Sequence, residues 1–205
     1  MNRTAEGATL ALTAGDRIRD TARRLFYHQG IRAIGVDEIV RRARATKPSL
    51  YRSFASKDEL AAAYLRDWDR AFWQRFEAAV VARPDNPRAQ LHLLLSRLSR
   101  RMRLPGYRGC GLTNAAIEYP EAGHPARRVA VANKRKLRRR LREMAAAMGA
   151  RQPSQLGDAL TLLLEGAFVS SQLFGRDGPG RVLSQVAGQL IDAALPRRPA
   201  GRRAH

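Results

Sequence analysis

The residues best suited to chemistry lie in the segment 41–60, which reads RRARATKPSLYRSFASKDEL. Two short stretches with helical apolar spacing flank a break at residues 44–45, and Thr46 stands where the second helix needs an N-cap. This spacing is typical of two helices joined by a tight turn, the helix-turn-helix arrangement. The second helix would present five side chains that can hydrogen-bond phosphates or base edges, and these are Lys47, Ser49, Tyr51, Arg52 and Ser53.

Catalytic or metal chemistry has little support in the sequence. The four histidines His28, His92, His124 and His205 lack metal-ligand spacing, and no serine elbow, glycine-rich phosphate loop or paired-carboxylate site is evident. A single cysteine, Cys110, argues against a disulfide framework and a cysteine-based zinc site. We interpret it as a small buried residue, with redox sensing as the alternative. We therefore expect no enzyme activity, no metal and no cofactor.

The composition indicates a polyanion as partner. The chain has 205 residues with 38 Lys+Arg and 18 Asp+Glu, a net charge of +20. This excess favours nucleic acid or an anionic membrane surface. No uncharged stretch exceeds ten residues, which excludes a transmembrane helix, and residues 1–15 are too weakly apolar for a signal peptide. We expect a cytoplasmic protein.

The apolar periodicity predicts an all-α fold of about nine helices, with no period-2 segment of strand length. Thr13 and Asp16 resemble a capping box, Gly30 is a suitable C-cap, and Ser56 caps a long fourth helix. We expect residues 1–13 and 196–205 to be disordered. The expected helices cover about residues 14–29, 36–43, 47–54, 57–82, 88–104, 111–119, 125–148, 154–174 and 181–195.

Residues 14–60 resemble the N-terminal DNA-binding domain of the tetracycline-repressor (TetR) family of bacterial transcriptional regulators. The rest of the chain is similar to that family only in length and helical layout. The resemblance is carried by Leu25-Phe26, Gly30, Asp37-Glu38-Ile39, the run Thr46-Lys47-X-Ser49-Leu50-Tyr51-X-X-Phe54, and Ser56-Lys57-Asp58-Glu59-Leu60.

The resemblance implies a helix-turn-helix domain at 14–60 and a ligand-binding and dimerisation domain at 61–195. It implies a sequence-specific repressor that a small-molecule effector releases from an inverted-repeat operator in double-stranded DNA. Arg52 is the best candidate for reading guanine and Lys57 for binding phosphate. The competing interpretation is a merely solvated polar face. The implied DNA contacts are Thr46, Lys47, Pro48, Ser49, Tyr51, Arg52 and Lys57.

Two residues depart from the family pattern. Arg44 stands where the family usually has glycine, and a left-handed backbone there would cost about 1 kcal/mol or somewhat more. Gly35 stands where the family often has Ser or Thr as the cap of the second helix, so the usual phosphate contact there is in doubt.

The resemblance also implies an effector pocket whose occupancy moves the fourth helix and weakens operator binding. The alternative is simple core packing. Asn114 and Glu118, four residues apart, share a helix face and could bind a ligand or form a local network. The candidate lining residues are Trp68, Phe72, Phe76, Leu94, Leu98, Met102, Asn114, Ile117, Glu118 and Phe168.

Wide apolar faces at 154–174 and 181–195 resemble the family's dimer interface, a four-helix bundle made from two helices of each protomer. The basic segment 134–142 is interpreted as a solvated helix face, with a second nucleic-acid or acidic-ligand surface as the alternative. For the whole chain, the alternative function is generic nucleic-acid compaction or membrane-surface binding driven by charge, which salt and sequence dependence would separate from specific regulation.

Overall fold

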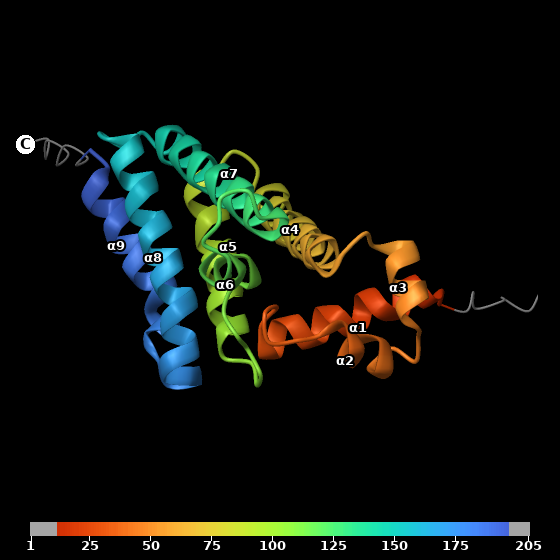
Figure 1. Ribbon diagram of the computed structural model, residues 1–205. Coiled ribbons are helices and arrows are strands. Elements are labelled where there is room, and N and C mark those ends of the chain that lie inside the picture. Colours follow the sequence, from red (N-terminus) through yellow and green to blue (C-terminus); the bar gives the residue numbers. More distant parts are fainter. Residues whose placement is uncertain (1–11, 197–205) are drawn as a thin grey trace, which may run out of the picture.

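The computed structural model describes residues 12–196, and within this range the chain is helical with no strand (Figure 1). The predicted all-α fold is confirmed, and each predicted helix ends within a few residues of its expected bounds. Of the segments predicted to be disordered, 1–13 and 196–205, residues 1–11 and 197–205 lie outside the described residues, and Thr13 is the N-cap of the first helix. The helices are α1 (Ala14–Gln29), α2 (Val36–Arg42), α3 (Lys47–Ser53), α4 (Lys57–Val81), α5 (Pro87–Met102), α6 (Gly111–Glu118), α7 (Pro125–Ala147), α8 (Pro153–Phe174) and α9 (Leu183–Ala194), with short 3-10 turns η1 (Gly175–Asp177) and η2 (Pro179–Val182).

The first helix begins at the predicted capping box. The Thr13 Oγ1 accepts the backbone N–H of Asp16 at 3.1 Å, and the Asp16 carboxylate accepts the backbone N–H of Thr13 at 3.1 Å. One face of α1 buries Ile18, Leu25 and Phe26 against α2 and α3. The same periodicity that predicted the helix therefore builds the core of the N-terminal three-helix unit.

Helix α4 joins that unit to the rest of the molecule. It begins at Ser56, whose Oγ accepts the backbone N–H of Glu59 at 3.1 Å, and it runs for 25 residues. Figure 1 shows α4 leaving the α1–α3 unit and passing into the larger helical body, where it packs against α5 and α7. A displacement of α4 would therefore change contacts in the α1–α3 unit and in the larger helical body.

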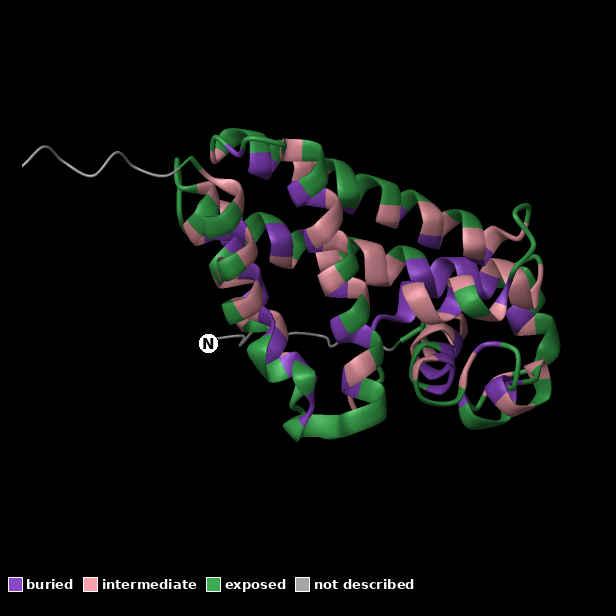
Figure 2. Ribbon diagram, turned by 90° about the vertical axis from the view of Figure 1, so that its left-hand side faces the viewer, coloured by how far each residue is buried: buried purple, intermediate pink, exposed green. Residues whose placement is uncertain are grey.

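Helices α8 and α9 lie side by side at the end of the molecule remote from α3 (Figure 1). Their outward faces are among the exposed surfaces in the burial-coloured view (Figure 2), although they carry apolar side chains such as Leu162 and Leu173. Among the described residues, no helix is both long and apolar enough to cross a membrane.

The basic segment 134–142 lies on α7 and is more than a solvated face. Lys134 pairs with Glu165 at 2.7 Å, while Arg138 and Arg142 both pair with Asp158 of α8. On the other side, two cations cover aromatic rings of α4. The Nζ of Lys136 lies 4.0 Å from the ring centre of Trp73, and the guanidinium of Arg140 lies 5.5 Å from that of Phe76. These contacts attach α7 to α8 and to α4.

Candidate nucleic-acid interface and cavity

The turn between α2 and α3 has the strained residue that the sequence predicted. Arg44 has φ +48°, in the left-handed region that favours glycine. The Ala45 N–H donates to the carbonyl of Val40 at 2.9 Å, which closes the C-terminus of α2. The guanidinium of Arg17, on α1, donates to the carbonyls of Ala43 (3.2 Å) and Arg44 (3.3 Å). This role of Arg17 was not predicted, and no local pattern signals it because the partners lie 26 and 27 residues away.

One face of helix α3 is buried and the opposite face is exposed. The side chain of Leu50 is fully buried and Phe54 is half-buried, so both anchor the helix against the three-helix core. At its start, the Thr46 Oγ1 accepts the backbone N–H of Ser49 at 3.3 Å and lies 2.9 Å from the Ser49 Oγ. The cap fixes the direction of the first turn, where Pro48 is exposed.

The outer face of α3 carries the predicted polar side chains. Tyr51 is 52% exposed and Arg52 is also exposed, and the Arg52 guanidinium has no acidic partner among the described residues. Lys47 pairs instead with Asp37 of α2 at 2.7 Å, and this hydrogen bond raises the pKa of Lys47. Lys47 must leave Asp37 before it can reach a phosphate.

Lys57 is the first residue of α4, four residues after the end of α3. Its side chain is half-buried, its Nζ lies 3.4 Å from the carbonyl of Arg32, and burial lowers its pKa. Gly35 caps α2 without a side-chain hydrogen bond, as expected. Six of the seven predicted DNA contacts thus lie on α3 or its cap, and Lys57 lies at the start of α4.

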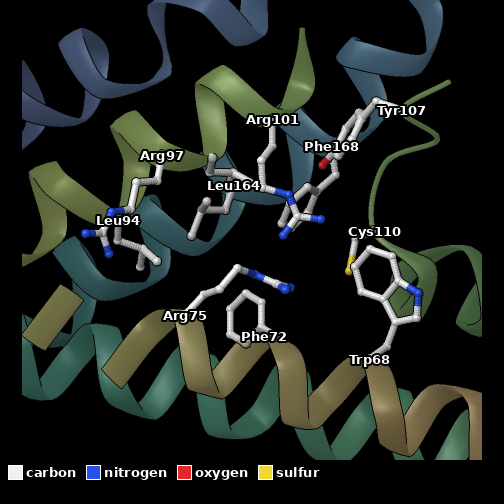
Figure 3. Close-up of a pocket in the computed structure, with 11 residues that line it drawn as sticks. Trp68, Phe72, Arg75, Leu94, Arg97, Arg101, Tyr107, Cys110, Leu164 and Phe168 are labelled. Carbon is white, nitrogen blue, oxygen red and sulfur yellow. The ribbon is translucent and has the colours of Figure 1, made fainter. Parts of the chain in front are cut away.

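A cavity lies between α4, α5, α8 and the segment that precedes α6 (Figure 3). Its volume is about 60 Å³, below the roughly 300–1,000 Å³ typical of small-molecule sites, so a ligand of that size would have to widen it. Five of the predicted lining residues are on its wall, namely Trp68, Phe72, Leu94, Leu98 and Phe168. The wall also includes Arg75, Arg97, Arg101, Tyr107, Cys110 and Leu164, which the sequence analysis did not assign to it.

The missed arginines do have a signal in the sequence. Arg75 follows Phe72 by three residues and Trp68 by seven, so it continues the same face of α4. Likewise Arg97 and Arg101 lie on the α5 face that contains Leu98. A search restricted to apolar and aromatic side chains passes over a charged residue at such a position.

The other five predicted pocket residues do not line this cavity. Phe76 is buried in a cluster with Trp73, and Met102 packs against Gly180. Ile117 is 71% exposed because α6 buries its opposite face. The side chain of Asn114 donates to the Arg108 carbonyl at 2.8 Å and accepts from Gln172 at 3.3 Å, while Glu118 contacts the N-terminal unit. Asn114 and Glu118 are therefore both hydrogen-bonded within the protein, and the partners of Glu118 belong to a segment distant in sequence.

Glu118 joins α6 to the segment after α1. Its Oε2 accepts the backbone N–H groups of Ile31 (2.7 Å) and Arg32 (2.9 Å), and its carbonyl accepts from the Arg32 guanidinium at 3.1 Å. Gly30, with φ +90°, lets the chain turn against this carboxylate, since a Cβ there would lie only 3.3 Å from it. The end of α6 is therefore bonded to the helix-turn-helix unit.

Comparisons with known proteins agree with this geometry. Residues 18–64 match the model of the family described as bacterial regulatory proteins, tetR family. Over 52 residues the chain is 42% identical to an uncharacterized HTH-type transcriptional regulator of Mycobacterium tuberculosis. That match covers 25% of this chain and 26% of the relative, so it spans about a quarter of the length of the curated relatives.

Two solved structures are similar over nearly the whole chain. One is a TetR-family transcriptional regulator from Streptomyces coelicolor, with 31% identity and a TM-score of 0.80, covering 89% of this chain and 94% of that one. The other is described as a TetR transcriptional regulator from Streptomyces avermitilis, with 30% identity and a TM-score of 0.77, covering 89% and 98%. The likeness includes the body of helices around the cavity as well as the helix-turn-helix.

Proposed function

The chain belongs to the TetR family of DNA-binding transcriptional regulators, and from this premise we propose that it is a repressor released from its operator by a small molecule. As a homodimer it would bind an inverted repeat in double-stranded DNA. The unit at 14–60 would read the DNA, and the helices at 61–195 would bind the effector and the second protomer.

The outer face of α3 is the observation that carries the proposal. A helix anchored by Leu50 and capped by Thr46 exposes Tyr51 and Arg52 in a row, the arrangement with which a recognition helix enters the major groove. The positions of Lys47 and Lys57 at its edges suit phosphate contacts that set its register.

An exposed apolar stripe on α8 supports a dimer. Leu162 is 74% exposed and Leu173 is 71% exposed, and Val169 lies between them on the same helical face. Gly166 also lies on this face with open space where a Cβ would be, so a second helix could approach closely. Paired about a two-fold axis, α8 and α9 of two protomers would form a four-helix bundle.

Release would act through α6. The N-terminal end of α6 follows Cys110 in the cavity wall, and its C-terminal end holds the helix-turn-helix unit through Glu118. A ligand that displaces α6 or α4 would change the distance between the two recognition helices of the dimer, and both half-sites could no longer be bound together.

Selection of bound fragments from random DNA with the full chain tests the proposal. We expect a palindromic motif with half-sites about one helical turn apart, and protection of that motif at moderate salt. Binding that loses all sequence preference as salt rises would support generic nucleic-acid compaction instead. In a reporter with the motif at a promoter, transcription should rise when the gene for this protein is deleted. A fall would identify an activator.

Light scattering after size exclusion tests the dimer. The wild-type chain should be a dimer at micromolar concentration and Leu173→Arg a monomer, because the new charge lies in the proposed interface. Leu104→Arg is the matched control, since Leu104 is also exposed but lies in the loop after α5. A monomeric wild type would contradict the dimer, and so would equal dissociation of both variants.

A further inference from the structure

Three arginines line the cavity without an acidic partner. Arg75 extends from α4, and Arg97 and Arg101 extend from α5. No carboxylate lines the same wall, and among residues 12–196 none of these guanidinium groups makes an ion pair or a hydrogen bond within the protein. Arginine side chains that lie at a cavity and are not neutralised by their own chain are available to an anion from outside.

Two of the three guanidinium groups converge. In Figure 3 those of Arg75 and Arg101 point into the same open space, one from each wall. Burial and, next, the charge of Arg101 lower the pKa of Arg75 to about 10. The free protein therefore holds two like charges together at a partly desolvated position, an arrangement that an anion between them would relieve.

The remainder of the wall is mainly apolar and aromatic. Phe72 lies beside Arg75, and Trp68 and Cys110 close the opposite end of the cavity in Figure 3. Burial raises the pKa of Tyr107, so its phenol stays neutral. The apolar wall favours an apolar body and the arginine pair favours an anionic head. The body would contact Trp68, Phe72, Leu94, Leu98, Leu164 and Phe168.

A second recess indicates the orientation in which such a molecule would bind. It shares Trp68, Arg75 and Arg101 with the first cavity and opens toward α1, where Arg23, Arg24, Tyr27 and His28 line it. Its carboxylate, Asp67, is already paired with Arg19 and Arg70. The two arginines thus lie at the junction between an apolar cavity and a basic recess, which places a head at the junction and a tail in the cavity.

We propose that this cavity binds an amphipathic organic acid, with its carboxylate between Arg75 and Arg101 and its hydrocarbon body among the apolar side chains. Each guanidinium can form two parallel hydrogen bonds with a carboxylate, which a lysine ammonium cannot do. The inference names the class of effector for the proposed function and rests on that function only for the consequence that binding alters DNA affinity.

Tyr27 connects the head-group site to the helix-turn-helix unit. Its hydroxyl accepts the backbone N–H of Arg108 at 2.8 Å and donates to the carbonyl of Gly109 at 3.3 Å, and its ring lies 5.3 Å from that of Trp68. An acid that moves Trp68 or the 108–109 backbone would therefore act on α1 directly, besides acting through α6.

Matched probes test the head group. Titration calorimetry and thermal shift with the full chain would compare 4-phenylbutyrate, 4-phenylbutan-1-ol and 4-phenylbutylamine, which share a body and differ in charge. We expect the acid to bind about 10- to 100-fold more tightly than the alcohol, the factor expected for a charge-assisted hydrogen-bond pair, and the amine not to bind. Decanoate serves as an acid with an aliphatic body, and inorganic phosphate as an anion without a body that should fail to bind.

Variants test the arginines. Arg75→Gln and Arg101→Gln should each weaken binding of 4-phenylbutyrate about 10- to 100-fold. Arg100→Gln, the neighbouring exposed position on α5, should leave it unchanged. Arg75→Gln should also raise the melting temperature of the free protein, because it removes one of two converging like charges. A purely structural arginine would instead lower it. Arg75→Lys should restore part of the binding.

The outcomes separate this inference from the proposed function. Arginine-dependent binding of 4-phenylbutyrate or decanoate that leaves the protein on its operator supports the inference and contradicts effector release. Equal binding of acid and alcohol overturns the inference, as does undiminished binding by the glutamine variants. It is also overturned if neither acid binds at millimolar concentration. In each of these cases release from DNA by a neutral compound would leave the proposed function standing.

Discussion

Basic residues gather on α7 and around the cavity between α4 and α5, and their partners differ. On α7, Arg138 and Arg142 share the carboxylate of Asp158, each with two N–H···O bonds of 2.6–2.8 Å. At the cavity, Arg75 and Arg101 have no ion-pair partner among the described residues. The first group joins helices and the second leaves its hydrogen-bonding capacity unused. A positive charge in this protein is therefore informative about binding only where the chain does not neutralise it.

Net charge alone conceals this difference. Residues 1–57 contain 12 basic and 5 acidic residues (+7), and residues 58–205 contain 26 and 13 (+13). By count the C-terminal part is the more basic, yet much of its charge on α7 is paired. On α3, Arg52 belongs with the unpaired group, whereas Lys47 is paired with Asp37 in the absence of DNA. If pairing separates structural from binding residues, substitutions in the two groups should differ in what they change.

The largest effect is expected for the unpaired Arg52. Arg52→Ala should cost about 1–3 kcal/mol of operator binding and relax the preference at one base position. Lys57→Ala should weaken all sequences alike, because the phosphate contact proposed for Lys57 would be lost. Fluorescence anisotropy against operators changed one base pair at a time would measure both. Arg139→Ala, on the exposed side of α7, is the control that should change neither affinity nor preference. Uniform loss with Arg52→Ala would make it a phosphate contact only.

Substitutions in the ion pairs of α7 should lower the free energy of unfolding. The Glu165 carboxylate accepts from Lys134 at 2.7 Å and from the Thr113 hydroxyl at 2.8 Å, and the two charged side chains are less than one-third exposed. Glu165→Gln should lower the free energy of unfolding by about 1–2 kcal/mol, because the Lys134 charge keeps its burial and loses its counter-ion. Chemical denaturation at fixed protein concentration measures it.

A double-mutant cycle sharpens this prediction. With Lys134→Met as the second change, the cycle should show favourable coupling between the two positions. If the effects of Glu165→Gln and Lys134→Met are additive, the pair does not stabilise the packing of α7 against α8. The proposed structural role of the paired cations on α7 would then be wrong.

The features that could be predicted from the sequence are those that depend on residues close together in the chain. Caps at Thr13, Thr46 and Ser56 and the apolar periodicity placed the helices, and the turn position of Arg44 implied its left-handed backbone. Contacts between distant segments were not predicted. Glu118 bonds to residues 86 and 87 positions away, and Arg75 faces Arg101 across a cavity whose shape depends on how helices cross. Periodicity tells which face is inward, but not what an inward arginine meets there.

Arg44 is a basic residue whose effect comes from its backbone rather than its charge. Arg44→Gly should raise the free energy of unfolding by about 0.5–1 kcal/mol, since the relief at φ +48° outweighs the added freedom of the unfolded chain. Arg44→Ala removes the charge but retains a Cβ, so it should give no such gain. A lower melting temperature for Arg44→Gly than for wild type would show that the turn needs the arginine side chain.

The smallest effect is expected at Asp158, whose carboxylate remains in contact with water. Hydrogen bonds from Arg138 and then Arg142 hold its pKa well below the ordinary value. The ionised form is thus favoured in the folded state, so its stabilisation is present above the ordinary Asp pKa and is lost as pH falls from there through the lowered pKa of the folded state. Melting temperatures between about pH 5 and pH 2 should fall less steeply for Asp158→Asn than for wild type. Parallel curves would mean that the pairing is not formed in solution.

The backbone N–H groups of Ile31 and Arg32 donate to the Glu118 carboxylate, so the exchange rates of these two protons report on this contact. They can exchange with solvent deuterium only when the end of α6 separates from the chain behind α1, so their exchange rate counts how often the contact opens. Backbone amides inside α1 and α4 exchange by other openings and supply an internal reference. Two resonances would then report, in the absence of any DNA, how tightly the two parts of the protomer are coupled at a given moment.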